Sequence, residues 1–379
     1  MKILIDARMY GLENAGIGRY LINLLGELEK TDKENQYLIL LRKKYYDLLV
    51  FPKNWDKYCA DFRHYTINEQ FLLPRILKKQ RADIVHFPHF NVPVFWRGNF
   101  VVTIHDMTIH KQGIEATNLP MPLYFLKKIL YRYVFKQAIL RSKAILTPSA
   151  TTKSELLDYF NIKKEKITVI YEGYKKDFGL DGVPVGEINI LSKYNLLNKD
   201  YFFYVGNAYP HKNLERAIKS VIDVNENRKV NVQFVIAGLK DSFMSVLEKI
   251  TDKYKGKKYI KIIGFVSDLE LAILYKHSLG FLYPSLSEGF GLQGLEAISC
   301  GTIILCSNIP IFREIYQGHA FYFDPKDTGS ISSTLYSVAI MNRVDKNKYI
   351  KSAQDFIKKY SWQKMASETL KVYEGCSGI

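Results

Sequence analysis

Short apolar runs alternate with longer stretches of helical character along the whole chain. The runs lie at residues 2–6, 37–41, 83–87, 100–105, 144–147, 167–171, 201–205, 232–237, 260–263, 280–283 and 302–305. Continuous runs of this length are typical of parallel strands that helices cover on both faces of a sheet. The pattern therefore predicts an α/β chain with two successive, doubly wound, Rossmann-like domains.

A polar stretch with several glycines, from Gly173 to Leu197, separates the two sets of runs and predicts a linker. A last segment, residues 347–374, predicts a helix that packs on a core through Trp362. The 379 residues are enough for two domains. We place these domains at 1–178 and 179–355, followed by a C-terminal helix at 356–379.

The chain is strongly basic, with 54 Lys and Arg against 38 Asp and Glu and a net charge of +16. Such an excess favours an anionic partner, whether nucleic acid, a phosphorylated small molecule or an acidic membrane face. The four cysteines form no CxxC pair, which indicates free thiols in a reducing compartment. No apolar run approaches the ~18 residues of a membrane span, and Asp6 comes too early for a secretory signal. We therefore expect a cytoplasmic protein.

The stretch from Tyr283 to Ala297 combines a strand end, a loop with glycines and a helix that begins near Gly291. The start of a helix presents free N–H groups and the positive end of its dipole, which suits an anion. Glu288 lies in the loop and Glu296 in the helix, where carboxylates can accept hydrogen bonds from sugar or ribose hydroxyls. On spacing alone, the alternative is equally favoured: Glu288 would be a solvated acid in the loop and Glu296 an acid on the helix surface.

Two further residues lie where α/β sheets bind ligands. His105 closes the strand that begins at Val101, at a carboxyl end of the sheet, and a structural histidine is the alternative. Lys212 lies at a predicted helix start, where a lysine is usually solvated but can also stabilise a phosphate. Asp6 and Arg8 end the first strand, and we expect them to face the same cleft.

One pattern argues against a dinucleotide site and another argues against a metal site. The turn Gly16-Ile17-Gly18 lacks the third glycine of a dinucleotide fingerprint. His86-x-x-His89 has no evident third ligand, so we interpret it as an aromatic wall. The chain also contains no Asp-x-Asp, the motif with which many metal-dependent transferases hold a metal diphosphate.

Taken together, these motifs resemble the retaining glycosyltransferases of family 4, which have the two-domain GT-B fold. Their E-x7-E motif in a Glu-Gly-Phe-Gly context is matched by Glu288 to Glu296, and residues 300–304 resemble the Cys-Gly-Thr-Pro-Val that follows it. This sequence departs from the family pattern at Gln293, where proline is common, and at His211, where arginine is usual. The resemblance runs from Asp6 to Trp362.

The resemblance implies a fold and a site. Two Rossmann-like domains would face a deep cleft, with residues 1–178 binding the acceptor, residues 179–355 binding the nucleotide sugar, and the C-terminal helix crossing back to the N-terminal domain. Glu288 would hold the sugar hydroxyls, Lys212 the diphosphate and His105 the donor sugar as catalytic residues. The other implied donor-site residues are Gly16, Gly18, Gly206, Asn207, His211, Phe265, Val266, Gly289, Phe290, Gly291, Leu292 and Glu296, the last on the ribose.

The sequence thus predicts a retaining, metal-independent transferase that needs no cofactor and uses a nucleotide diphosphate sugar as its donor substrate. By resemblance to mannosyl- and rhamnosyltransferases, GDP-mannose is the first expectation for the donor. The expected acceptor is a saccharide or lipid-linked oligosaccharide of bacterial surface polysaccharide, including lipopolysaccharide. A non-catalytic sugar-nucleotide-binding protein of the same fold is the alternative. A basic nucleic-acid-binding protein is less favoured, because no nucleic-acid motif is present.

The segment 121–143 mixes basic and aromatic residues at helical spacing. The residues in question are Tyr124, Phe125, Lys127, Lys128, Tyr131, Arg132, Phe135, Lys136 and Arg141. This mixture suits an interfacial helix on an anionic membrane, and the alternative is a core-facing helix whose lysines face water. We expect a peripheral protein at the inner face of the cytoplasmic membrane.

Overall fold

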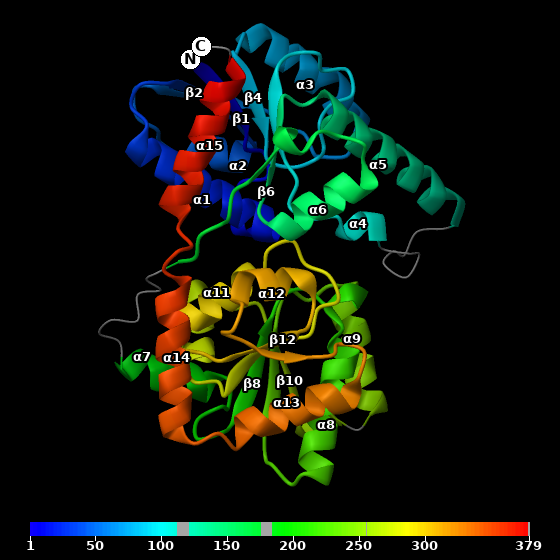
Figure 1. Cartoon of the computed structure of the whole chain (residues 1–379), viewed down its shortest axis with the longest axis vertical. Helices are drawn as coiled ribbons and strands as arrows, with labels where there is room; N and C mark the ends of the chain where they lie inside the picture. Colours follow the sequence, from blue (N-terminus) through cyan, green and yellow to red (C-terminus); the bar gives the residue numbers. More distant parts are fainter. Residues whose placement is uncertain (112–120, 176–183, 255, 378–379) are drawn as a thin grey trace. The chain divides into compact units, whose positions relative to one another are not determined.

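The computed structural model describes residues 1–111, 121–175, 184–254 and 256–377, which fold into two α/β units (Figure 1). Unit 1 comprises Met1–Gly173 and Tyr360–Ile379, and unit 2 comprises Tyr174–Lys359. The chain therefore leaves unit 1, builds unit 2 and returns to complete unit 1.

Unit 1 is built on a seven-stranded sheet in which every pair of neighbouring strands is parallel. Its strands, in sheet order, are β3 (Trp55–Cys59), β2 (Gln36–Leu41), β1 (Lys2–Asp6), β4 (Ile84–Phe87), β5 (Phe100–Thr103), β6 (Ala144–Thr147) and β7 (Ile167–Val169). The central strands are buried along their length, as their apolar sequences require.

Helices cover both faces of this sheet. They are α1 (Ala15–Thr31), α2 (Lys43–Leu48), α3 (Ile67–Gln80), α4 (Thr108–Lys111), α5 (Met121–Arg141), α6 (Ala150–Tyr159) and α15 (Trp362–Ser377). One face carries the main core, where Leu73 of α3 and Phe135 of α5 pack against strand residues such as Val85. On the other face α15 lies beside α1, as Figure 1 shows, and the Tyr373 hydroxyl lies 2.6 Å from Nδ1 of the buried His86.

Unit 2 is built on a six-stranded sheet, also parallel throughout. Its strands, in sheet order, are β10 (Ile260–Gly264), β9 (Gln233–Ala237), β8 (Tyr201–Val205), β11 (Gly280–Tyr283), β12 (Ile304–Ser307) and β13 (Phe321–Phe323). Its helices are α7 (Pro184–Lys193), α8 (Leu214–Asn227), α9 (Ser242–Lys253), α10 (Asp268–Lys276), α11 (Leu292–Ser299), α12 (Pro310–Tyr316), α13 (Thr328–Ala339) and α14 (Arg343–Ile357). The core on one face joins α8, α9 and α13 to alternate residues of the strands.

The prediction of two doubly wound parallel units with a C-terminal helix is confirmed. The apolar runs did not reveal β3 and β13, which are two of the four edge strands. β3 reads Trp-Asp-Lys-Tyr-Cys and is partly exposed, and β13 has only three residues. Edge strands are covered on fewer sides, so they need no continuous apolar run.

Two local predictions are corrected. Part of the predicted linker is helix α7, which contacts α10, whereas the Gly179–Gly182 stretch and the proposed boundary at 178 lie outside the described residues. The expected single helix at 347–374 is two helices, α14 in unit 2 and α15 in unit 1. The chain leaves the helical path near Tyr360, which is buried, and Ser361 accepts a hydrogen bond from the Lys364 backbone as α15 begins.

The start of α1 is held by close backbone packing at Gly18. A methyl group at Gly18 would overlap the carbonyl oxygen of Gly11, whereas Gly16 has open space around it. Gly18 is therefore required for the approach of the β1–α1 loop to its helix, and Gly16 is not.

Gly18→Ala is expected to lower the free energy of unfolding by about 1–3 kcal/mol, the usual cost of overpacking. Gly16→Ala serves as the matched control and should be neutral or stabilising by up to about 1 kcal/mol, because alanine favours helix. The measurement is the urea midpoint of the full chain. Equal midpoints for the two variants would show that the Gly11 contact is not restrictive.

Candidate active site

In unit 2 the candidate site lies at the carboxyl ends of the adjacent strands β8 and β11. The loop after β8 and the loop after β11 are joined by a hydrogen bond of 2.7 Å from the Leu286 backbone N–H to the His211 carbonyl. Asn213 at the start of α8 extends this link, because its side-chain amide donates to the carbonyls of Pro284 (3.1 Å) and Pro325 (2.8 Å). The loops that carry the predicted donor-site residues are thus fixed to one another.

Lys212 and Glu288 form an ion pair across these two loops. Lys212 Nζ lies 2.6 Å from Glu288 Oε1, and the two side chains are only 10% and 12% exposed. The fold therefore brings together two charges that lie far apart in the sequence. The two opposite charges of this largely buried pair compensate each other, and removal of either partner would leave an uncompensated charge.

Helix α11 begins directly after Gly291, as predicted. Gly291 has a φ of +96°, its carbonyl accepts a hydrogen bond from the Tyr316 hydroxyl, and a Cβ there would lie 2.5 Å from that hydroxyl. Only glycine fits this position. Gly289 and Phe290 precede it in the loop, and Leu292 opens the helix. The structure thus has the predicted helix start beside the Lys212–Glu288 pair.

Glu296 is 3% exposed on α11, so it is not the solvated helix-surface acid of the alternative interpretation. Its charge is among the causes, after burial, that raise the pKa of the Cys300 thiol to about 12. A buried carboxylate of this kind is suited to hydrogen-bonding hydroxyl groups.

Two polar atoms near these loops lack a hydrogen-bond partner among the described residues. They are Asn207 Oδ1, after β8, and Ser285 Oγ, after β11. Because an unpaired buried polar atom is costly, each is a candidate contact for a bound ligand. Asn207 was expected from the sequence, but Ser285 was not. The position of Ser285 between Tyr283 and Glu288 could have indicated it as a site residue.

The loop after β10 presents an exposed aromatic side chain. Phe265 is 68% exposed, Val266 is buried, and Ser267 with Glu270 forms a capping box at the start of α10. Burial raises the pKa of Glu270, but hydrogen bonds from Lys193 and from Ser267 outweigh it and bring the pKa to about 2. The carboxylate stays ionised and keeps the loop fixed beneath Phe265.

In unit 1, His105 lies just beyond β5, at the carboxyl edge of the sheet. Its Nδ1 lies 3.3 Å from Glu172 Oε1, and its Nε2 lies 3.0 Å from the Pro88 carbonyl oxygen. The ring of Tyr20 packs edge-on against the imidazole at 5.0 Å. Glu172 was not predicted from the sequence, because it follows β7 in a strand–loop segment that carries no motif.

Two other histidines lie close to this edge and are neutral. Burial, and then the charge of His105, lower the pKa of His86 to about 3 and that of His89 well below its usual value. His86 Nε2 lies 2.8 Å from Thr103 Oγ1, and His89 Nδ1 lies 3.4 Å from the Tyr65 hydroxyl. Within the described ranges, no group of three metal-ligating side chains is found.

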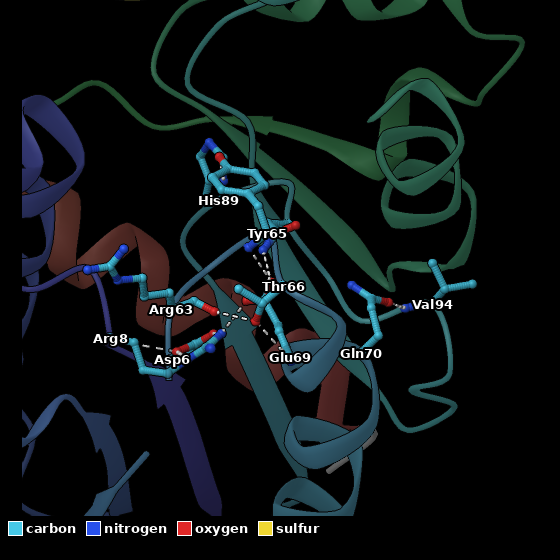
Figure 2. A network of polar contacts seen from close by, with 10 residues as sticks. Asp6, Arg8, Arg63, Tyr65, Thr66, Glu69, Gln70, His89 and Val94 are labelled. Carbon is cyan, nitrogen blue, oxygen red and sulfur yellow. Dashed lines mark hydrogen bonds and ion pairs between the residues drawn. The ribbon is translucent and has the colours of Figure 1, made fainter. Parts of the chain in front are cut away.

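Asp6 and Arg8, expected to face a cleft, are joined with Glu69 in a buried network (Figure 2). Arg8 Nη2 lies 2.6 Å from Asp6 and 2.7 Å from Glu69, and the Tyr65 backbone and the Asn91 amide also donate to Glu69. Burial favours the neutral form of both carboxyls. At Asp6 the contacts with Arg8 outweigh burial, so the pKa is lowered. At Glu69 burial outweighs the contacts with Arg8, so the pKa is raised. The network fixes the start of α3 against β1, and the sequence alone did not indicate Glu69.

Two family models match the chain in succession. The model described as Glycosyltransferase Family 4 matches residues 15–178, and the model described as Glycosyl transferases group 1 matches residues 188–356. The two matches correspond to the N-terminal part of unit 1 and to most of unit 2.

Curated relatives share roughly a quarter of their residues with the chain. It is 28% identical over 267 residues to the O-antigen chain mannosyltransferase RfbU of Salmonella typhimurium, which covers 69% of this chain and 67% of the relative. It is 27% identical over 303 residues to the O-antigen chain mannosyltransferase B of Escherichia coli, which covers 79% of this chain and 76% of the relative.

Solved structures show the same fold at low sequence identity. The structure of Anabaena Alr3699/HepE in complex with UDP and glucose has a TM-score of 0.75 and 14% identity, covering 99% of this chain and all (100%) of the other. The structure of WaaG, a glycosyltransferase involved in lipopolysaccharide biosynthesis, has a TM-score of 0.73 and 12% identity, covering 98% and 99%. The predicted GT-B fold is thereby confirmed.

Proposed function

Because the chain belongs to the glycosyltransferases, with a family 4 domain followed by a group 1 domain, we propose that it moves a hexose from a nucleotide diphosphate sugar to a saccharide or lipid-linked acceptor. The transfer retains the anomeric configuration and uses no metal. The observation that carries this proposal is the Lys212–Glu288 ion pair, in which we propose that the cation binds the diphosphate and the carboxylate binds the sugar hydroxyls.

The donor would separate this ion pair and become the binding partner of both side chains. Its diphosphate attracts the Lys212 ammonium and the positive end of the α11 dipole. Glu288, released from the lysine, then accepts hydrogen bonds from the sugar hydroxyls, and the buried Glu296 accepts them from the ribose. Phe265 offers an exposed ring to the nucleobase, and His105 of unit 1 is assigned to the donor sugar.

Retention follows from attack on the same face as the leaving group. The bond from the anomeric carbon to the diphosphate oxygen breaks while the acceptor oxygen binds that carbon, and the acceptor proton passes to a diphosphate oxygen. No protein nucleophile is needed for these steps. The protein's contribution is to orient the two substrates and to stabilise the negative charge that develops on the diphosphate.

GDP-mannose is the proposed donor, and a bacterial surface polysaccharide such as lipopolysaccharide is the proposed product. Both proposals are supported by the relatives named as O-antigen mannosyltransferases. A thermal-shift panel of GDP, UDP, dTDP and ADP sugars would identify the donor. A ligand at 100 times its dissociation constant adds about 2.7 kcal/mol of stability.

Glu288→Gln is expected to reduce turnover by about 100- to 1,000-fold, or ~2.7–4 kcal/mol, while nucleotide binding changes little. The reason is that the carboxylate contacts the sugar, whose charge changes in the transition state. The measurement is steady-state transfer with the donor found by thermal shift. The exposed Glu248→Gln on α9 is the control for loss of one charge in unit 2. Unchanged turnover in Glu288→Gln would remove this residue from the site, and a wild type that binds donor without transfer would favour a non-catalytic binding protein.

Activity should persist in EDTA. Lys212 and the start of α11 supply the positive charge that a metal would otherwise bring to the diphosphate. The measurement is the transfer rate before and after chelation. Complete loss of activity in EDTA, with recovery on adding magnesium or manganese, would contradict metal-independent transfer.

A docking patch for an anionic membrane is proposed on α5 and the adjoining surface. Large apolar side chains of α5 are exposed, among them Phe125, Leu126, Ile129, Leu130 and Tyr133. At the end of α5 the Arg141 guanidinium donates to the Val94 carbonyl, next to Phe95, whose ring stacks on Phe71 of α3 at 5.1 Å. Two more exposed aromatic rings therefore lie near the end of α5.

The basic residues of α5 supply the charge that complements acidic lipid. Lys127, Lys128 and Arg132 lie among the exposed apolar side chains. Not every predicted contact belongs to the patch, because Phe135 is fully buried and Tyr131 packs on Phe90. In the part of the chain that the structure describes, no helix is long and apolar enough to cross a bilayer. The location that we propose is the cytoplasmic face of the membrane, which the protein would reach by docking through this patch.

Changing Lys127, Lys128 and Arg132 together to Gln should release the protein from anionic vesicles without altering nucleotide binding. Each basic residue near such a surface contributes ~1 kcal/mol, and salt screens this attraction. Co-flotation at low and high salt is the measurement. The control is the triple change of Lys249, Lys253 and Lys257 to Gln, which removes the same charge from unit 2. Failure of the wild type to float with acidic vesicles at low salt would leave these residues as a solvated helix face.

A further inference from the structure

Arg8 keeps one unpaired nitrogen within the buried network of unit 1 (Figure 2). Its Nε and Nη2 lie 2.7 Å and 2.6 Å from the two carboxylate oxygens of Asp6, and Nη2 also lies 2.7 Å from Glu69 Oε1. The Phe62 ring faces the guanidinium, with its centroid 4.8 Å from Cζ. Nη1 has no hydrogen-bond partner among the described residues, although the Arg8 side chain is fully buried. Because an unpaired buried donor is costly, Nη1 marks a place for an oxygen atom that these residues do not supply.

The occupied nitrogens of Arg8 decide the chemical class of that oxygen. Arginine normally holds a phosphate or carboxylate ligand by two parallel N–H bonds, but here Nε and both hydrogens of Nη2 are already given to Asp6 and Glu69. Nη1 alone offers a contact at one point. Asp6 already balances the charge of Arg8, and Glu69 adds a second carboxyl group, so the guanidinium has no net positive charge to offer an anion. An uncharged oxygen, such as the hydroxyl of a sugar, fits this position best.

An exposed aromatic ring lies beside the same network. The Tyr65 backbone N–H donates to Glu69 Oε2 at 2.8 Å, and Arg8 donates to the other oxygen of that carboxylate, so both groups lie within reach of one sugar ring. Tyr65 is 61% exposed, its hydroxyl lies 3.4 Å from His89 Nδ1, and the two rings meet edge-on. A sugar presents a C–H face that packs on an aromatic ring and a rim of hydroxyls that form hydrogen bonds. The Tyr65 ring and the Arg8 donor match these two features.

We propose that unit 1 holds a saccharide site at the carboxyl ends of β1 and β4, in which Arg8 Nη1 donates to a sugar hydroxyl and the Tyr65 ring packs on the face of the same sugar. The neighbouring strands β1 and β4 are followed by connections that leave in opposite directions across the sheet, and open α/β sheets bind ligands at such a point. Because the Arg8 side chain is fully buried, binding includes a shift of the side chains around it. The exposed Arg63 and Tyr65 of the adjoining loop are available for this shift.

If the chain acts as the proposed glycosyltransferase, this site takes the acceptor. It then selects an acceptor whose terminal sugar is uncharged over one that ends in a sugar acid or a phosphate. That assignment rests on the proposed function, whereas the binding of an uncharged sugar by unit 1 does not.

The test is saturation-transfer NMR and titration of the full chain with three pairs of probes at neutral pH. Each pair consists of the methyl α-glycoside of mannose, glucose or galactose and the methyl α-glycoside of the corresponding uronic acid, which has the same ring and one negative charge. At least one neutral glycoside should bind, more tightly than its acid partner by about 10-fold or more. Absence of binding by all three neutral glycosides, or equal or tighter binding of the acid partner, would overturn the proposal.

Tyr65→Ala removes an exposed ring, so this variant should fold. Binding of the neutral glycoside should weaken about 3- to 10-fold, the usual worth of an aromatic contact. Tyr159→Ala, which removes a tyrosine of α6 that is 52% exposed in the same unit, is the matched control and should bind as the wild type does. Glu288→Gln alters the candidate donor site in unit 2 and should also leave glycoside binding unchanged. Unchanged binding in Tyr65→Ala, or weakened binding in Glu288→Gln, would place the sugar elsewhere and overturn the proposal.

Arg8→Lys keeps a positive charge between Asp6 and Glu69 but removes Nη1. The affinity for the neutral glycoside should fall about 10- to 100-fold, the worth of one hydrogen bond to a charged group. Unchanged affinity in a folded Arg8→Lys would show that Nη1 holds only water and would overturn the proposal. Should Arg8→Lys fail to fold, as its urea midpoint would reveal, Tyr65→Ala decides the question. A wild type that binds the neutral glycoside without any glycosyl transfer would refute the proposed function and keep the saccharide site, and transfer without glycoside binding would do the reverse.

Discussion

Parallel pairing is the constraint on which both units depend. In each sheet every neighbouring pair of strands runs in the same direction, so the chain must cross back after each strand, mostly through helices and between β4 and β5 through the loop of residues 88–99. All carboxyl ends then lie at one edge, followed by the loops that lead into the helices. Charged side chains are costly within strands buried on both faces, and they collect at this edge instead. Lys212 and Glu288 lie at this edge in unit 2, and His105 lies at the corresponding edge in unit 1.

The charges collected at these edges are largely balanced within the protein itself. Lys212 is paired with Glu288, and Arg8 with Asp6 and Glu69. Such pairs contribute little net stability, because desolvation offsets their attraction, but they hold loops in defined positions. A ligand that binds at the Lys212–Glu288 pair must therefore replace the protein partner of a charged side chain, because the charges are already paired. This favours ligands that carry both a group for the cation and a group for the carboxylate.

The sequence was informative where a pattern is local. Continuous apolar runs predicted the buried strands, and the glycines around Gly291 predicted the start of α11. The role expected of Lys212 and Glu288 came from a family resemblance, and their contact could only come from the adjacency of β8 and β11. Glu69 and Glu172 were missed for the same reason, since their partners Arg8 and His105 follow strands that are remote in sequence. The break between α14 and α15 was missed because both helices are amphipathic and only their packing on different units separates them.

The return of the chain to unit 1 has a consequence for the order of folding during synthesis. Residues 360–377 emerge from the ribosome only after the whole of unit 2, yet α15 covers one face of the first sheet and contacts His86 through Tyr373. Until then that face, with the buried ring of Tyr20, is left without its helix. Unit 2, which is continuous in sequence, can complete its core first, so the N-terminal half must wait in a partly covered state that chaperones are suited to protect.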